Sequence, residues 1–161
     1  MNKLFVWSIL VLVSLAAAQT QAPSTPPAAK TPGEDYSRMY SFFREGEFVQ
    51  ITVEEAGRVT GFVSRYSEDN SGNFLDHFFK DGKLDGNKLT FTTKTVHGVW
   101  YEFNGTVERG EGKNPGDEAY YELKGTANEN TVDADYKTKT KAREVVWKSF
   151  PSDDESTGAK K

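Results

Sequence analysis

The fold class follows from residues 48–66, which read FVQITVEEAGRVTGFVSRY. From Val49 to Val53 every second residue is aliphatic, and this period of two is typical of a strand with one buried face. The segment Glu55-Ala56-Gly57 interrupts the pattern and ends in glycine, which suits a three-residue hairpin loop closed by a left-handed residue. Such a loop gives the two strands one apolar face and an ion pair beside the turn. The predicted cross-strand pairs are Glu54 with Arg58, Val53 with Val59, Ile51 with Gly61, and Val49 with Val63.

A second hairpin is predicted around Val96-His97-Gly98, which again ends in glycine. A two-residue His-Gly turn would place Phe91 opposite Asn104 and turn the aromatic rings to different faces of the sheet. A three-residue loop places Phe91 opposite Phe103, so we predict the three-residue loop. The pairs that this loop predicts are Thr93 with Tyr101, Phe91 with Phe103, and Leu89 with Gly105.

The rest of the chain repeats this organisation. Residues 44–46, Arg-Glu-Gly, predict a third loop of the same kind, which would join residues 36–43 to residues 47–54. The apolar residues of 36–43 also have helical spacing, so a short helix is an alternative there.

The predicted architecture is an up-and-down meander of about eight antiparallel strands, and closure into a barrel would remove the exposed edges. A two-sheet sandwich is the alternative architecture. Further strands are predicted over residues 74–84, 118–127 and 136–150.

Two short stretches carry a resemblance to a known family, and the second of them is repeated later in the chain. Residues 82–91 read GKLDGNKLTF, and residues 101–106, YEFNGT, are echoed by residues 121–126, YELKGT, with a glycine inside each strand. Such glycines relieve crowding where a sheet bends sharply. This rhythm of strands and turns resembles that of lipocalin-like, or calycin-like, barrels of secreted bacterial proteins. The resemblance implies a closed all-β barrel that encloses an apolar ligand, and it assigns no binding residue.

The ends of the chain predict export. Residues 1–18 combine a basic start, an apolar run and three alanines, the pattern of a signal peptide cleaved after Ala18. Residues 19–35 are Pro-rich and predict a disordered tether, and residues 151–161 predict a disordered polar tail. One folded domain is left, residues 36–150. Because small secreted proteins commonly carry disulfides and this chain has no cysteine, we favour a bacterial protein of the periplasm or the extracellular space.

Composition excludes several classes of function. The 161 residues include no cysteine, which removes disulfide frameworks, thiol nucleophiles and thiolate metal sites. The formal net charge of −4 opposes general binding to nucleic-acid phosphates. After the leader, no segment is long and apolar enough to predict a transmembrane span. We expect a monomer that uses no cofactor.

No catalytic residue is predicted. The chain lacks the Gly-x-Ser-x-Gly elbow, the phosphate loop and the His-Glu-x-x-His motif, and it has only two histidines. Asp76 and His77 are adjacent in a predicted strand and point to opposite faces, so they do not form a catalytic pair. An inward-facing His77 is interpreted as a hydrogen-bonded core residue, and His97 as a turn residue.

No metal site is predicted either. Residues 68–73, and Asp81 with Asp85 and Asn87, offer oxygen ligands of the kind that calcium takes. The residue order of the known calcium loop is absent, however, and these residue types are typical of turns.

Aromatic residues divide into an inner and an outer set. The inner set shares the apolar face with the aliphatic residues, and such an interior either fills with side chains or holds one small ligand. If it holds a ligand, polar tips would orient the molecule and the glycine-rich residues 109–117 would form a mobile rim. The predicted ligand-binding residues are Phe91, Thr93, Tyr101, Phe103 and Tyr121. The predicted interaction surface on the outer face is formed by Trp100 and Tyr120.

A basic stripe follows the last strand, where Lys137, Lys139, Lys141 and Arg143 alternate and project from one face. We interpret it as a solvated edge protected from strand pairing, with an anion-binding surface as the alternative.

Two functions follow from these patterns. The first is a secreted, non-enzymatic barrel that reversibly binds a small, mostly apolar ligand. The alternative is a filled barrel that binds a protein or glycan partner through its exposed aromatic residues.

Overall fold

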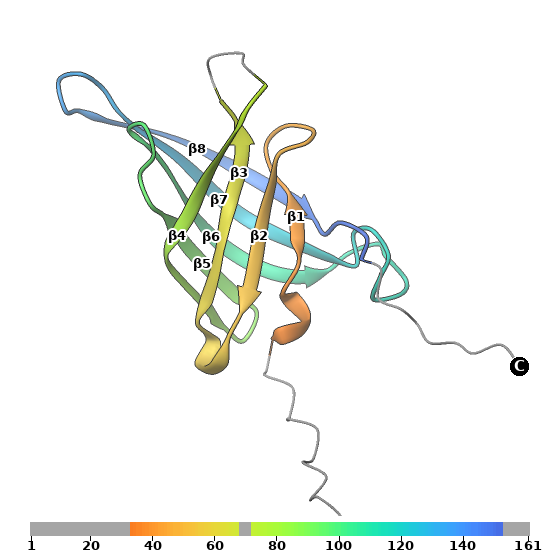
Figure 1. Ribbon diagram of the computed structural model, residues 1–161. Helices are drawn as coiled ribbons and strands as arrows, with labels where there is room; N and C mark the ends of the chain where they lie inside the picture. Colours follow the sequence, from red (N-terminus) through yellow and green to blue (C-terminus); the bar gives the residue numbers. More distant parts are fainter. Residues whose placement is uncertain (1–32, 68–71, 153–161) are drawn as a thin grey trace, which may run out of the picture.

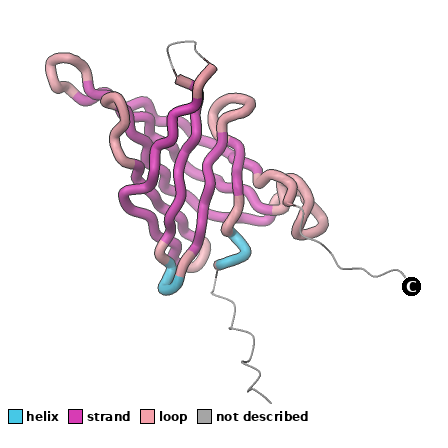
Figure 2. The backbone as a smooth tube through the Cα atoms, viewed as in Figure 1, coloured by secondary structure: helices cyan, strands magenta, loops and turns pink. Residues whose placement is uncertain are grey.

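The computed structural model describes residues 33–67 and 72–152, which form one curled antiparallel sheet of eight strands (Figure 1). Each strand pairs with the next one along the chain, so the predicted all-β up-and-down meander is confirmed, and the strands share one sheet rather than two. Within these residues, helix is confined to two short 3₁₀ turns, η1 (Glu34–Tyr36) and η2 (Glu55–Gly57) (Figure 2). The strands are β1 (Met39–Ser41), β2 (Phe48–Val53), β3 (Val59–Tyr66), β4 (Phe74–Asp85), β5 (Lys88–Thr93), β6 (Val99–Arg109), β7 (Tyr121–Val132) and β8 (Thr138–Lys148).

Some predictions fall on other parts of the chain. The predicted leader, residues 1–18, lies outside the described residues, as do most of the predicted tether and tail and residues 68–71 of the acidic loop. Within the described residues, no helix is long and apolar enough to cross a membrane.

The first and last strands meet where the sheet curls around. Tyr40 of β1 forms an isolated bridge with Ser149, just after β8. The Phe150 amide donates to the Met39 carbonyl oxygen over 2.9 Å, and the Lys148 amide donates to the Ser41 hydroxyl over 3.0 Å. β1 and β8 are therefore neighbours over a short length.

The first predicted hairpin is confirmed in its register. Val53 pairs with Val59, Ile51 with Gly61, and Val49 with Val63. In the loop, Gly57 has a φ angle of 73°, the left-handed conformation predicted for the closing residue. Ala56 is left-handed as well, with a φ angle of 57°, which the predicted turn did not include. Arg58 and Glu54 form the predicted ion pair beside the turn.

The second hairpin has the predicted register and a different turn. Phe91 pairs with Phe103, and Leu89 with Gly105. The predicted three-residue loop is wrong, because Val96 and Val99 form a bridge around His97 and Gly98, whose φ angles are 50° and 76°. A turn with two left-handed residues matches the twist of the strands. One extra residue between Thr93 and Val96 then brings Phe91 opposite Phe103 again. The prediction did not include such an extra residue.

Residues 36–43 contain the predicted strand, as β1, and not the alternative helix. A 3₁₀ turn ends at Tyr36, and β1 follows after two residues. The loop to β2 is one residue longer than predicted, because the Phe42 amide donates to the Glu47 carbonyl oxygen and leaves residues 43–46 in the loop. The strand predicted over residues 118–127 begins later and runs further, as β7.

A bulge in β4 changes which of its residues face inward, from odd-numbered ones before the bulge to even-numbered ones after it. Before the bulge, His77 and Phe79 lie on the inner side; after it, Gly82 pairs with the inward-facing Phe91, and Leu84 is buried. The register shifts between Phe79 and Asp81, which leaves Lys80 as the extra residue.

A glycine pair lies where β6 and β7 cross the core. Gly105 is directly opposite Gly125, so the two YEFNGT-like repeats lie side by side in antiparallel strands. A Cβ atom on Gly105 would lie 2.2 Å from the Lys124 carbonyl oxygen, and one on Gly125 would lie 2.3 Å from the Asn104 carbonyl oxygen. Both positions therefore exclude a side chain.

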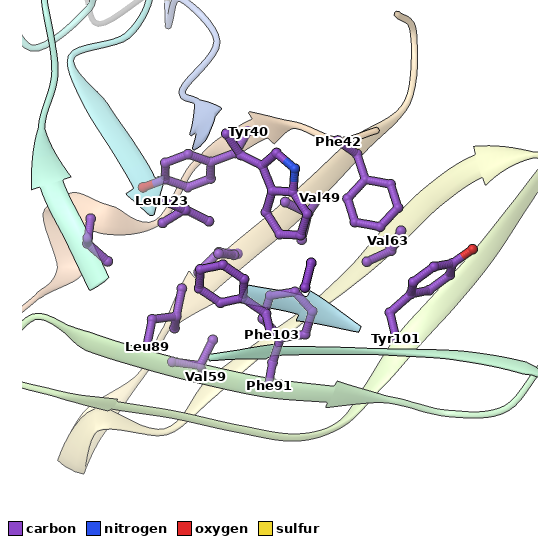
Figure 3. Packing of buried hydrophobic residues seen from close by; sticks show 14 of the residues in the cluster. Tyr40, Phe42, Val49, Val59, Val63, Leu89, Phe91, Tyr101, Phe103 and Leu123 are labelled. Carbon is purple, nitrogen blue, oxygen red and sulfur yellow. The ribbon is translucent and has the colours of Figure 1, made fainter. Parts of the chain in front are cut away.

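The core lies inside the curl of the sheet, where labelled side chains from facing strands converge (Figure 3). Stacked rings run through it: the ring centroids are 4.3 Å apart for Phe79 and Phe91, 5.5 Å for Phe91 and Phe103, and 5.1 Å for Phe103 and Trp147. The aliphatic residues of the first hairpin pack against this stack. Large side chains thus fill the middle of the interior.

Candidate functional site

Four of the five predicted ligand-binding residues lie together inside the sheet. Phe91, Thr93, Tyr101 and Phe103 are each only 2–3% exposed. The Tyr101 amide donates to the Thr93 hydroxyl over 2.9 Å, which joins the end of β5 to β6. The two phenylalanines belong to the packed ring stack, whereas the Tyr101 hydroxyl lies at the margin of the cluster (Figure 3).

Tyr121, the fifth predicted residue, lies at the other end of the sheet. It pairs with Arg109, and its ring meets that of Tyr36 edge to face at 4.9 Å between centroids. The predicted rim, residues 109–117, leads into the same end. The structure therefore separates Tyr121 and the rim from Tyr101.

The two predicted surface residues are also apart. Trp100 pairs with Asn130, whereas Tyr120 precedes β7 and stacks under the Arg109 guanidinium at 3.3 Å. Arg109 lies nine positions after Trp100 along β6, which is about 30 Å of strand. Trp100 and Tyr120 therefore do not form one surface.

A charged cavity lies at the upper end of the sheet, which carries the loops of residues 43–46, 94–98 and 133–137 (Figure 1). We call it the upper cavity; its volume is about 390 Å³. Strands β3, β6, β7 and β8 and the β1–β2 loop supply its walls, so residues distant in the sequence meet there. It is lined by Phe43, Arg44, Glu47, Arg65, Ser67, Tyr101, Glu129 and Arg143.

Hydrogen bonds and ion pairs link the charged groups of the upper cavity. Arg65 Nη1 donates to the Tyr101 hydroxyl over 2.5 Å, and Arg143 Nη2 donates to Glu129 Oε2 over 2.7 Å. Arg65 Nη1 also lies 3.9 Å from Glu129 Oε1, so one carboxylate faces two guanidinium groups. The Arg143 guanidinium lies 4.2 Å from the centre of the Phe43 ring.

Tyr101 is a neutral hydrogen-bond donor at the floor of this cavity. Burial raises the pKa of its hydroxyl to about 12, although the hydrogen bond from Arg65 opposes the rise. Because this hydroxyl accepts a hydrogen bond from Arg65, its own proton remains to be donated.

Glu47 holds the wall of the cavity in place. Its carboxylate is buried and accepts hydrogen bonds from Arg44 Nε over 2.9 Å and from the Tyr66 amide over 3.2 Å. It therefore ties the β1–β2 loop to β3 and has a structural role. Arg65, Glu129 and Arg143 are left as the charged groups best placed to meet a ligand.

Sequence reasoning missed most of these residues, although one signal was present. Arg143 belongs to the basic stripe, which we interpreted as a solvated edge. Lys137, Lys139 and Lys141 are indeed exposed, but Arg143 is half-buried and faces Glu129 inside the curl. The buried Trp147 is four residues further along β8, so continuing its phase of two would have placed Arg143 on the inner face.

A larger hollow of about 850 Å³ lies over β3 to β7 and is lined mainly by outward-facing polar residues. Thr90, Asn104 and Thr126 form one cross-strand row there, and Thr92, Glu102 and Asn128 form the next. These side chains stand in solvent on the outer face of the sheet, so we place the candidate site at the upper cavity. Among the described residues, no group of three His, Cys, Asp or Glu could hold a metal ion.

Comparisons with known proteins identify the fold. No protein-family model matches the chain, and no curated protein matches its sequence. The structure is similar to that of rhizavidin, with a TM-score of 0.55 and 13% sequence identity over 79% of this chain and 96% of that chain. For the rhizavidin–biotin complex the TM-score is 0.53, with 12% identity over 72% of this chain and 92% of that chain. At these identities the likeness shows the fold alone, which is that of an all-β, calycin-like barrel with eight up-and-down strands.

Proposed function

We propose that this chain is an exported, monomeric, non-enzymatic protein whose sheet closes into a barrel and reversibly binds a small ligand in the upper cavity. One observation carries the proposal: a charged cavity lies at one end of an interior whose middle is filled by side chains. The fold supports it, because a structural neighbour is a complex with biotin. Ligand binding at the mouth of a β-barrel is also common.

The ligand that suits this cavity has a mostly apolar body and one acidic group. Phe43 and Tyr101 supply aromatic walls for the body. Three arginines and two glutamates line the cavity, so it carries a net positive charge in a chain whose net charge is −4. A carboxylate on the ligand would compete with Glu129 for Arg65 and Arg143, and the Tyr101 hydroxyl would donate to it.

Two substitutions with opposite expected effects on the affinity for an acid test this function. Isothermal titration calorimetry would compare hexanoate with hexanol, which has the same chain length and no charge. Arg143→Gln should weaken hexanoate binding about tenfold, because a charge-assisted hydrogen bond is lost. Glu129→Gln should strengthen it, because the competing carboxylate is removed. Neither substitution should change the binding of hexanol.

Matched controls make the same charge changes on the outer face. Lys148 and Glu144 lie on β8 next to inward-facing positions, and both side chains are exposed. The substitutions Lys148→Gln and Glu144→Gln should leave hexanoate binding unchanged. The proposal fails if hexanoate binds no better than hexanol, or if the outer substitutions act as strongly as the inner ones. Biotin, the ligand of the structural neighbour, is a further probe under the same design.

Export is tested separately from ligand binding. In a bacterial host, N-terminal sequencing of the exported protein should read Gln19 first, because we expect cleavage after Ala18. Retention of the full chain in the cytoplasm would contradict export and would leave the ligand experiment intact.

A row of outward-facing rings favours a second candidate function, binding of a protein or glycan partner. Phe48, Phe62 and Phe78 cross β2, β3 and β4, with ring centroids 5.8 Å and 5.5 Å apart, and Phe78 is 54% exposed. Exposed aromatic side chains are enriched where partners bind. Under this reading, Phe78→Ser should abolish retention on protein or glycan arrays and leave hexanoate binding unchanged.

A further inference from the structure

The Arg65 side chain crosses one end of the interior. Its Nη1 donates to the Tyr101 hydroxyl over 2.5 Å and lies 3.9 Å from Glu129 Oε1. Arg65 belongs to β3, whereas Tyr101 and Glu129 belong to β6 and β7, neither of which pairs with β3. These contacts therefore run through the interior and not along the sheet. The buried Arg65 side chain is a crossbar between distant parts of the sheet.

A second cavity adjoins the upper cavity at this crossbar. We call it the side cavity; its volume is about 380 Å³. Arg65 and Ser67 line both cavities. The remaining walls of the side cavity come from residues 73–77 and 96–99, whereas those of the upper cavity come mainly from the β1–β2 loop, β7 and β8. The side cavity is lined by Arg65, Ser67, Asn73, Leu75, His77, Val96, His97 and Val99.

The two cavities differ in chemistry. Leu75, Val96 and Val99 give the side cavity apolar walls, and among the described residues no carboxylate lines it. His77 adds no charge at neutral pH, because burial lowers the pKa of its imidazole. Both of its ring nitrogens are buried, so they offer a ligand no hydrogen bond. The side cavity therefore suits an apolar group, and the upper cavity suits an acid.

The middle of the interior is closed to a ligand that enters the upper cavity. Phe103 follows Tyr101 as the next inward residue of β6, and its ring lies 5.5 Å from that of Phe91, between centroids. Both phenylalanines belong to the packed ring stack. A long apolar group therefore cannot continue from Tyr101 toward the middle, and the side cavity is the apolar space that adjoins the upper cavity.

We propose that the two cavities form one divided site for an elongated amphipathic acid, whose acidic head binds Arg65 and Arg143 in the upper cavity and whose apolar tail passes Ser67 into the side cavity. The small side chain of Ser67 leaves room for the tail beside the Arg65 crossbar. This inference rests on the proposed function and deepens it, because it assigns a place to the part of the ligand that lies far from the acid.

A chain-length series tests the proposal on the unchanged protein. Isothermal titration calorimetry would compare hexanoate, octanoate and decanoate below the concentrations at which they form micelles. The affinity should rise about threefold for each added methylene group, because each is buried in the side cavity. Hexanoate binding with no gain for decanoate would overturn the divided site and leave the proposed function intact. Absence of hexanoate binding would instead contradict the proposed function.

A double substitution locates the tail. Val96→Thr with Val99→Thr keeps the shape of the side cavity and makes its wall polar, so decanoate should bind about tenfold more weakly and hexanoate equally well. The matched control is Val132→Thr with Val146→Thr, whose side chains are exposed and line neither cavity. This control should bind both acids as the unchanged protein does. Undiminished decanoate binding to the Val96/Val99 variant, or an equal loss in the control, would overturn the proposal.

Amide ¹H–¹⁵N spectra supply an independent readout. Decanoate should shift the resonances of Leu75 and Val99 much more than hexanoate does, because only the longer chain reaches the side cavity. Both acids should shift Arg143 alike. Decanoate-specific shifts on the outer face, at Phe62 and Phe78, with none at Leu75 and Val99, would place the tail elsewhere and overturn the proposal.

Discussion

At the scale of single residues, the two histidines differ in environment. His77 is buried in β4, whereas His97 is exposed in a tight turn, where its φ of 50° is left-handed. Burial and Arg65 lower the pKa of His77 below its ordinary value of 6.5. The unfolded chain therefore binds a proton that folded His77 does not accept, and this difference links stability to pH.

The sign of this linkage gives a prediction. As pH falls through about 6.5 toward the lower pKa of folded His77, the unfolded state takes up the proton first, so the free energy of unfolding decreases. Urea unfolding between about pH 8 and about pH 5 should show a smaller loss of stability for His77→Phe than for the unchanged protein. His97→Asn, which tolerates the left-handed turn, should retain the full loss. Equal pH dependence in all three proteins would contradict the buried, neutral His77.

The sequence was sufficient to place many individual side chains, but not the charged ones. Phe91 and Phe103 face each other because a period of two and one loop length fix their register. Glu129 and Arg143 escaped prediction because their meeting requires both the long β7 and the inward phase of β8. A charged residue in a strand is ordinarily assigned to solvent, and the end of a curled sheet is where this assumption fails.

At the scale of elements, the pairing of β6 with β7 depends on two glycines. The repeat in the sequence identified Gly105 and Gly125 as inward-facing glycines at a bend, and the structure places them directly opposite each other. Any side chain at either position would meet the backbone of the other strand. The two glycines therefore allow the strands to bend around the core.

Substitution of one glycine tests this account. Gly125→Ala should destabilise the protein by about 1–3 kcal/mol, because its methyl group would overpack against the Asn104 carbonyl oxygen and the Gly105 Cα. Gly86→Asn is the matched control, since nothing lies within 4 Å of a Cβ there and asparagine tolerates the φ of 62°. Urea unfolding measures both. If the Gly125→Ala protein is as stable as the control, β6 and β7 can move apart to accommodate the methyl group, and the account is contradicted.

The bulge in β4 and the turn after β5 mark the limit of pattern reading at this scale. Lys80 interrupts the alternation, so His77 and Leu84 both face inward although one is odd and the other even. No glycine or proline marks the bulge at Lys80 itself. Which residue is extra is decided by pairing with both β3 and β5, which is tertiary information. The extra residue before Val96 escaped prediction for the same reason.

At the scale of the whole molecule, β1 and the end of β8 meet over a short junction. The Phe150 amide donates to the Met39 carbonyl oxygen, and Tyr40 bridges Ser149. Sequence reasoning predicted closure from the general disadvantage of exposed edges, and it could not predict how few residues would form the junction.

Hydrogen exchange measures this closure. If the barrel is closed in solution, the Phe150 amide should exchange much more slowly than an unstructured peptide amide. The Leu123 amide, in the central part of the sheet, serves as the protected reference. Exchange of Phe150 at the unprotected rate, with Leu123 still protected, would describe an open curl and not a barrel.

The central claim is that side chains fill the middle of the interior and that the upper cavity at its end binds an acidic ligand. Amide ¹H–¹⁵N correlation spectra recorded during a titration with hexanoate test it most directly. We predict the largest shift changes at Arg65, Tyr101, Glu129 and Arg143, with little change at the buried Leu89. Shift changes confined to the outer row of Phe48, Phe62 and Phe78, or no changes at saturating hexanoate, would contradict the account.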